Sequence, residues 1–128
     1  MDQKEKLIYW KKIFILDFFF KKILLNYRKK MLNIFFKETK YKKQYSILDI
    51  GTTSSSEDGH NLLLDYIKNN KNITCLSNQN IANLHKKYKN IRSLITGDAK
   101  KMPFENNQFD ICYSSAIIEH VGSKKEQI

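Results

Sequence analysis

Residues that could bind a ligand stand at or beside the ends of four short apolar segments of the chain. Carboxylates and hydroxyls hydrogen-bond the polar groups of a ligand, and a glycine lets the backbone turn tightly and approach a ligand closely. The pattern therefore favours ligand binding by side chains at the ends of strands. In chain order the residues are Asp49 and Gly51, Ser77, Asp98, and Ser114.

Asp49, Ile50 and Gly51 resemble the opening of the glycine-rich loop in nucleotide-binding α/β domains. A helix beginning behind the glycine would offer backbone N–H groups to a phosphate or a carboxylate. The dinucleotide fingerprint is absent because Thr53 stands at its second glycine, and no P-loop sequence occurs. On its own, the motif is more typical of a plain turn from a strand to a helix.

The elements that would position these residues begin at residue 46. From there, apolar segments alternate with helical patterns over short connections, which predicts βαβ units and a parallel sheet. Right-handed crossovers would place the carboxyl ends of the strands at one edge, where open α/β sheets bind ligands. The predicted strands are residues 46–50, 73–77, 91–96 and 109–113, and the predicted helices are 61–67, 81–88 and 116–121.

Four motifs follow one another in this part of the chain. They are Ser46–Gly51, Thr96–Ala99 with Met102–Phe104, Gln108–Ile111, and Ile118–Val121. In this order and spacing they resemble the class I S-adenosylmethionine-dependent methyltransferases, in particular the group that acts on small molecules. The resemblance covers residues 46–122. It implies an α/β, Rossmann-like fold, S-adenosyl-L-methionine as the cofactor and a small-molecule methyl acceptor.

The resemblance also implies a role for each strand end. The residue that ends the second strand usually bonds the ribose hydroxyls, and the residues that end the third strand contact the adenine. Because in-line displacement at the sulfonium methyl depends on positioning, no catalytic residue is assigned. The implied cofactor residues are Asp49, Gly51, Thr52 and Thr53 around the methionine end, Ser77 and Asn78 at the ribose, Asp98 and Ala99 at the adenine, and Ser114 and Ser115 near the methyl group.

The chain departs from the family pattern in the first loop and at the end of the second strand. Thr53 and Ser55 replace the later glycines of the first loop, unless the loop is longer and Gly59 supplies the last one. Ser77 replaces the usual Asp or Glu, so the ribose would lose a charge-assisted hydrogen bond worth roughly 1 kcal/mol. We therefore expect weakened cofactor binding, and a non-catalytic α/β binding module is the alternative function.

The family sheet has seven strands, whereas the predicted strands number four. We therefore interpret residues 46–128 as an incomplete methyltransferase domain, with an activity that is in doubt for this chain alone. The fourth strand would be an uncovered edge that carries Phe109, Ile111 and Tyr113. A partner chain could pair with this edge.

Residues 1–45 form a basic leader of different composition. They carry 13 Lys and Arg against 4 Asp and Glu, whereas residues 46–128 carry 10 against 9. Residues 4–37 are predicted to form an amphipathic helix, with Asn26 and the Arg28–Lys30 run as a point where it could divide. It would either pack on its own domain or dock on an anionic membrane or a partner. Its lysine arc holds Lys4, Lys11, Lys12, Lys22, Lys29, Lys30 and Lys37, and its apolar side holds Trp10, Ile13, Phe20, Leu24, Tyr27, Met31 and Phe35.

Several other classes are disfavoured by the sequence. No segment of the leader is apolar over the ~20 residues that cross a membrane. A secretory signal is not expected, because Asp17 breaks the apolar run Ile13–Phe20 and no small-residue cleavage site follows it. Cys75 and Cys112 are expected to be buried free thiols in a reducing cytoplasm, which predicts a cytoplasmic or membrane-peripheral protein. The histidines have no metal-site spacing, so no metal is expected. Nucleic acid is disfavoured as a partner because the basic charge lies outside the predicted domain.

Overall fold

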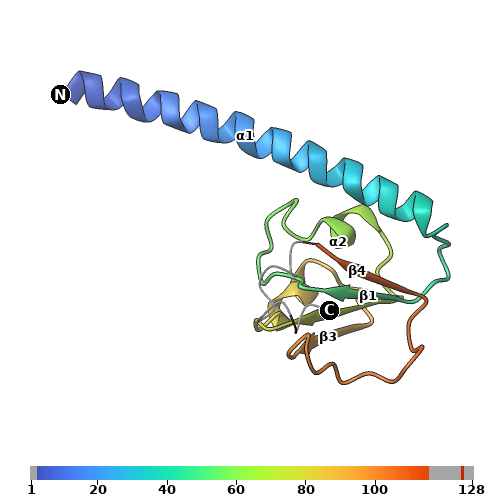
Figure 1. The fold of residues 1–128 in the computed structure, drawn as a ribbon. Coiled ribbons are helices and arrows are strands. Elements are labelled where there is room, and N and C mark those ends of the chain that lie inside the picture. Colours follow the sequence, from blue (N-terminus) through green and yellow to red (C-terminus); the bar gives the residue numbers. More distant parts are fainter. Residues whose placement is uncertain (1–2, 116–124, 126–128) are drawn as a thin grey trace. The chain divides into compact units, whose positions relative to one another are not determined.

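The computed structural model describes residues 3–115 and residue 125. The chain divides into two compact units, Met1–Glu38 and Thr39–Ile128. In the first unit, helix α1 runs without a break from Gln3 to Glu38 (Figure 1). It passes through Asn26, where the sequence allowed a division. The helix is continuous because this run contains neither proline nor glycine, the residues that most often kink or end a helix.

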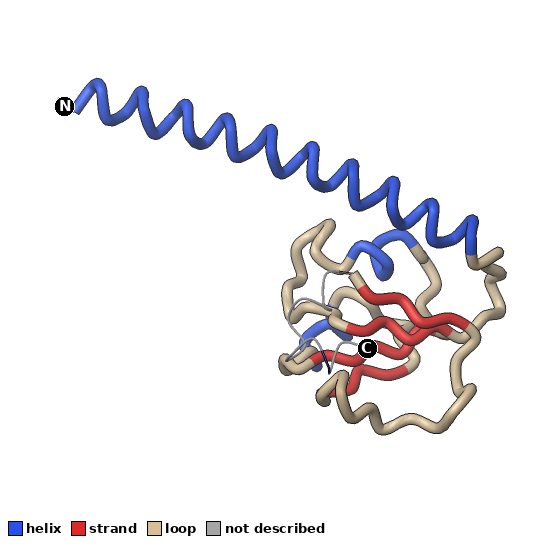
Figure 2. Tube along the Cα trace, viewed as in Figure 1, coloured by secondary structure: helices blue, strands red, loops and turns tan. Residues whose placement is uncertain are grey.

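The second unit is built on a four-stranded parallel sheet with the strand order β3-β2-β1-β4 (Figure 2). This arrangement confirms the predicted Rossmann-like α/β fold, preceded by an N-terminal helix. The chain order reverses beside β1, since β2 lies on one side of it and β4 on the other. The strands are β1 (Ile47–Ile50), β2 (Ile73–Ser77), β3 (Ser93–Thr96) and β4 (Ile111–Ser114).

The core of this unit forms around the two central strands. Every residue of β2 is buried, and so are the first three residues of β1. The connection from β1 to β2 contains the short helix α2 (Leu62–Tyr66), whose three leucines are buried. The connection from β2 to β3 contains the 3-10 helix η1 (Ala82–Lys86), where a longer helix over 81–88 was predicted. Leu84 is the buried residue of η1, and Ile81 and Tyr88, which flank it, are buried as well.

Two predicted features of β4 differ in the structure. The strand begins at Ile111 rather than at residue 109, because the side chain and N–H of Asp110 are hydrogen-bonded to Ser46. Cys75 is buried as predicted, but Cys112 is exposed, and its prediction as a buried thiol is wrong. Successive side chains of β4 point to opposite faces of the sheet, and Ile111 is on the covered face whereas Cys112 is on the exposed one. The predicted helix at 116–121 lies outside the described residues.

Candidate functional site

The carboxyl ends of the four strands meet at one edge of the sheet. In the strand register, Ile50 of β1 lies opposite Leu76 of β2 and Ser114 of β4. Ser77 of β2 lies opposite Thr96 of β3. Gly51, Asn78 and Asp98 each follow within two residues of these positions. The topology therefore brings together residues that are far apart in the sequence, at the side of an open α/β sheet where ligands bind.

Asp49 and Thr52 form a buried pair beneath the first loop. The Thr52 hydroxyl donates a hydrogen bond of 3.1 Å to Oδ2 of Asp49, and both side chains are at most 5% exposed. Burial raises the pKa of Asp49 to about 7, although the Thr52 hydrogen bond acts in the opposite direction. Burial, together with the charge of Asp49, also raises the pKa of Cys75 to about 12. The buried side chains of Asp49 and Thr52 therefore support the first loop from the interior of the domain.

Gly51 makes the turn out of β1. Its φ of 92° lies in the left-handed region, where a side chain would be strained. Its N–H donates to the carbonyl oxygen of Leu76 over 2.8 Å, which continues the β1–β2 pairing by one residue. The sequence prediction of a tight glycine turn is therefore met at this position. No helix begins directly behind it, however, because α2 starts only at Leu62.

Asn61 holds the loop that follows Gly51, and the sequence analysis did not single it out. Its Oδ1 accepts a hydrogen bond of 2.8 Å from the N–H of Thr53. Its Nδ2 donates a hydrogen bond of 3.0 Å to each of the carbonyl oxygens of Thr53 and Ser55. The Asn61 side chain is 4% exposed, so these bonds form out of water. One buried carboxamide thus shapes a loop in which Thr53 and Ser55 stand at the family's glycine positions.

Residues after β2 contact the same loop from the other side. The N–H of Ser54 donates a hydrogen bond of 3.0 Å to Oε1 of Gln79. Nδ2 of Asn83 donates a hydrogen bond of 3.0 Å to the carbonyl oxygen of Ser54. The hydroxyl of Thr96, at the end of β3, donates to the carbonyl oxygen of Gln79 over 3.3 Å. The ends of β1, β2 and β3 are therefore joined through Gln79. A lone Gln in a polar loop gives no sequence signal for such a contact.

A charged cluster fixes the far end of the loop. Nζ of Lys87 lies 2.7 Å from Oδ1 of Asp58 and 3.1 Å from Oδ1 of Asp65. The N–H of Gly59, whose φ is 82°, donates to Oδ2 of Asp65 over 2.7 Å, and the Tyr88 hydroxyl donates to Oδ1. Partial burial would raise the pKa of Asp65, but the hydrogen bonds from Tyr88, Gly59 and Lys87 outweigh it and hold the pKa below its ordinary value.

Ser77 and Asn78, the predicted ribose residues, have different surroundings. Ser77 is 4% exposed, and its Oγ accepts a hydrogen bond of 3.1 Å from the N–H of Gln79. The carbonyl oxygen of Ser77 accepts a hydrogen bond of 2.7 Å from the N–H of Gly97. Asn78 is exposed at the sheet edge. A ligand at this edge can therefore reach the Asn78 side chain, whereas the Ser77 hydroxyl points into the structure that supports it.

Asp98 opens the connection from β3 to β4. Its Oδ1 accepts the N–H of Lys100 over 2.9 Å, and its carbonyl oxygen accepts the N–H of Lys101 over 3.0 Å, so the residue organises a turn. The side chain is exposed, and a carboxylate has acceptor sites beyond this single bond. Gly97 before it is packed closely, since an added Cβ would lie 3.2 Å from Cδ1 of Leu76. Ala99 after it is half-buried.

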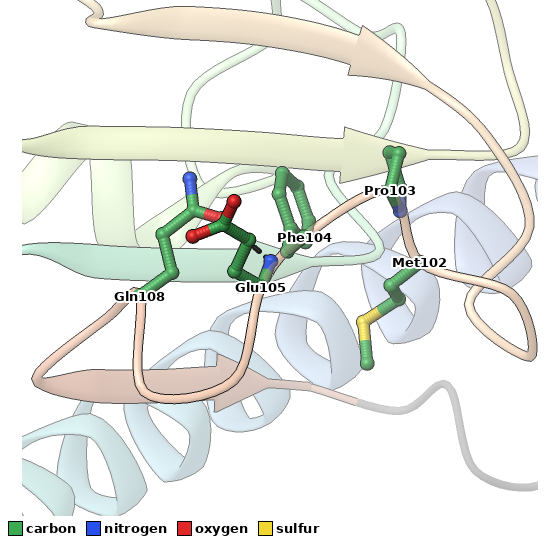
Figure 3. Close-up of a pocket in the computed structure, with 5 residues that line it drawn as sticks. All are labelled: Met102, Pro103, Phe104, Glu105 and Gln108. Carbon is green, nitrogen blue, oxygen red and sulfur yellow. Dashed lines mark hydrogen bonds between the residues drawn. The ribbon is translucent and has the colours of Figure 1, made fainter.

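An open pocket lies further along this connection (Figure 3). Phe104 packs edge-on against Phe109 with 5.0 Å between ring centroids. The N–H of Glu105 donates a hydrogen bond of 3.0 Å to Oε1 of Gln108, which closes the turn that carries these two lining residues. The pocket contains none of the predicted cofactor residues, although its first members follow Asp98 and Ala99 closely in the chain. It is lined by Met102, Pro103, Phe104, Glu105 and Gln108.

Ser114 and Ser115 complete the sheet edge at the end of β4. Ser114 is exposed and Ser115 is half-buried. The Ile118–Val121 motif lies outside the described residues. Within residues 3–115 and residue 125, no three His, Cys, Asp or Glu side chains are grouped so that they could hold a metal ion.

Comparison with known protein families identifies a match to the second unit of the chain. A family model described as "Methyltransferase domain" matches residues 48–128, which is more than half of the chain. No curated protein and no solved structure matches this chain. The matched residues begin at Leu48, the second residue of β1, and include the whole of β2, β3 and β4.

Proposed function

Because the chain belongs to the methyltransferase domain family, we propose that it binds S-adenosylmethionine at the carboxyl edge of its sheet and serves methyl transfer to a small-molecule acceptor. The observation that carries the proposal is the convergence of Gly51, Asn78 and Asp98 at this edge. These three residues come from three different strand ends. The edge lies where the strand order reverses, which is the usual place for a ligand in an open α/β sheet.

The residue types at the edge fit the groups of this cofactor. The exposed carboxamide of Asn78 can both donate to and accept from ribose hydroxyls. The carboxylate of Asp98 can accept from an adenine amino group while it keeps its hydrogen bond to Lys100. Gly51 allows the close backbone approach that the methionine end needs. We therefore assign the ribose contact to Asn78, with Ser77 as its buried support.

The first loop contributes a fixed shape. The N–H groups of Thr53 and Ser54 already donate to Asn61 and Gln79, so the loop is held by side chains from later parts of the chain. A loop held in this way loses little conformational freedom on binding, which favours affinity. This compensates in part for the missing glycines. Ser114 and Ser115 would line the site beside the methyl group, as the family resemblance implies.

When bound, the cofactor would supply a methyl group on a positively charged sulfur: the acceptor would form a bond to the methyl carbon while the carbon–sulfur bond breaks in line, and the sulfur would leave as a neutral thioether. The task of this chain is to hold and orient the cofactor, since positioning supplies much of the rate in such a reaction. No side chain is assigned as a catalytic acid or base.

A non-catalytic binding module is the second candidate, and Ser77 is the observation that favours it. A carboxylate at this position would make a charge-assisted bond to the ribose, whereas the Ser77 hydroxyl is 4% exposed and bonded to Gln79. Without the charge-assisted bond to the ribose, cofactor binding would be weaker by roughly 1 kcal/mol, which is about fivefold in Kd.

The test is a titration of the full chain with S-adenosylhomocysteine, followed by calorimetry and by thermal melts. We expect saturable binding and a raised Tm, because ligand at ~100 times its Kd adds about 2.7 kcal/mol to stability. Asp98→Asn should weaken binding about tenfold. The matched control is Asp17→Asn, the same change on α1 in the first unit, and it should leave binding unchanged. A cooperatively melting chain without saturable binding would overturn the proposal and favour the binding module.

A further inference from the structure

Helix α1 carries a large excess of positive charge. Between Gln3 and Glu38 there are ten Lys and Arg residues and three Asp and Glu residues. Even if each acidic side chain pairs with a cation, as Asp17 does with Lys21 at 2.8 Å, most of the positive charge stays unbalanced within the helix. The helix therefore presents a strongly positive surface to any partner.

The same helix exposes an unusual amount of apolar surface. It makes up the described part of its unit alone, so no other element of that unit can cover its side chains. The exposed fraction of six large apolar side chains between residues 10 and 23 lies between 61% and 75%. Large apolar side chains left exposed in this number indicate a surface that interacts with a protein or a membrane. The six residues are Trp10, Phe14, Leu16, Phe18, Phe20 and Ile23.

The distribution of these side chains around the helix is broad. At 100° per residue, Trp10, Ile13 and Phe20 fall opposite the arc of lysines. Ile15 and Phe19, however, fall within that arc. A helix that docks in a protein groove usually offers one narrow apolar stripe, with anchors three and four residues apart. The aromatic side chains that lie opposite the arc of lysines are instead typical of a helix lying in a membrane interface, where long lysine side chains reach the headgroups.

Other modes of association fit these features less well. No helix among the described residues is long and apolar enough to cross a bilayer. Pairing of α1 with a second copy would bring two strongly positive helices together and leave their charge unbalanced. Nucleic acid would balance the charge but leave the Trp10 and Phe14 region in water. An anionic bilayer satisfies both requirements, since it offers negative headgroups and an apolar phase.

We propose that α1 binds along the surface of an anionic lipid membrane, with its aromatic side chains in the interface and its lysines at the headgroups. The proposal does not depend on cofactor binding, because it concerns a different unit of the chain. It gives the chain a place of action at a membrane surface.

The experiment uses the full chain with vesicles of phosphatidylcholine alone and with added phosphatidylserine. Trp10 is the single tryptophan, so its fluorescence reports directly on α1. We expect sedimentation with the anionic vesicles, a blue shift of Trp10 emission on binding, and loss of both at high salt. Replacing Lys11, Lys22 and Lys29 together by Gln should weaken binding about fivefold per lysine, or roughly 100-fold in all.

The matched control replaces three exposed lysines of the second unit, Lys86, Lys89 and Lys101, by Gln. It should bind anionic vesicles like the natural chain. Circular dichroism of both triple variants verifies that α1 is intact. Equal binding to neutral and anionic vesicles would overturn the proposal, and so would equal losses in the two variants. A Trp10 shift that grows with protein concentration in the absence of lipid would overturn it in favour of self-association.

Discussion

Ser46 and Asp110 bind each other reciprocally across 64 residues of sequence. The N–H and the hydroxyl of Ser46 both donate to Oδ2 of Asp110 over 2.8 Å, and the N–H of Asp110 donates to Oγ of Ser46 over 3.1 Å. The two residues precede β1 and β4. Their bonds therefore set the register in which the last described strand joins the sheet, and with it the position of Ser114 at the site.

Asp110→Asn should lower the Tm at neutral pH, because the amide is a weaker acceptor for the two Ser46 donors. The hydrogen bonds from the backbone and side chain of Ser46 hold the pKa of Asp110 below its ordinary value. A lowered folded-state pKa stabilises the fold above about pH 4, and this contribution is lost as the pH falls through the folded value. The Tm difference between the natural chain and the variant should therefore be largest at neutral pH and vanish in acid. Glu105→Gln is the control, because Glu105 bonds Gln108 through its backbone.

Asp49→Asn should have the opposite pH signature. Burial raises the folded pKa of Asp49 to about 7, while the unfolded value is about 4. Between these values the folded chain keeps a proton that the unfolded chain releases, so the free energy of unfolding falls as the pH rises. The substitution by Asn removes this pH-dependent fall in the free energy of unfolding, which is on the order of 4 kcal/mol at most. We expect the variant to match the natural chain near pH 4 and to be the more stable one at pH 8, by urea titration. A variant that is less stable at pH 8 would contradict the burial argument.

Asn61→Ala should release the first loop. The change leaves one N–H and two carbonyl groups of Thr53 and Ser55 without their buried partner, at a cost of about 2 kcal/mol. The Tm should fall, and the affinity for S-adenosylhomocysteine should fall with it. Asn83→Ala is the matched control, because Asn83 also bonds a loop carbonyl but is exposed, so that water can replace it. Equal losses in both variants would remove the special role of Asn61.

Lys87→Met should loosen the far end of the same loop. Lys87 bonds the carbonyl oxygen of Ser56 over 3.1 Å and pairs with Asp58 and Asp65. Its removal should speed hydrogen exchange at the amides of residues 57–59, while exchange in β2 stays unchanged. Lys86→Met, at the exposed neighbouring lysine, is the control. Unchanged exchange in the loop would show that Asp65, Gly59 and Tyr88 hold it without Lys87.

Local sequence was enough to predict the strands and their shared edge. Each strand is a run of apolar and β-branched residues that ends at a polar residue or a glycine, and this pattern depends only on neighbours in the chain. Gly51 was predictable for the same reason, since a positive φ favours glycine whatever surrounds it. The exposure of Cys112 was not predictable, because it depends on which face of β4 the rest of the fold covers.

The residue types at the strand ends, the alternation of strands and helices, and the charge of the leader were thus determined by the sequence alone. Only the tertiary structure decided which of those residues face a ligand and which support the site. Ser77 and Thr52 are buried, whereas Asn78 and Asp98 are exposed. The loop is held by Asn61, Gln79 and Lys87, whose loop partners lie 6 to 31 residues away in the chain. Hydrogen bonds over such separations arise only when the sheet has formed, because no local pattern specifies which distant polar groups it brings together.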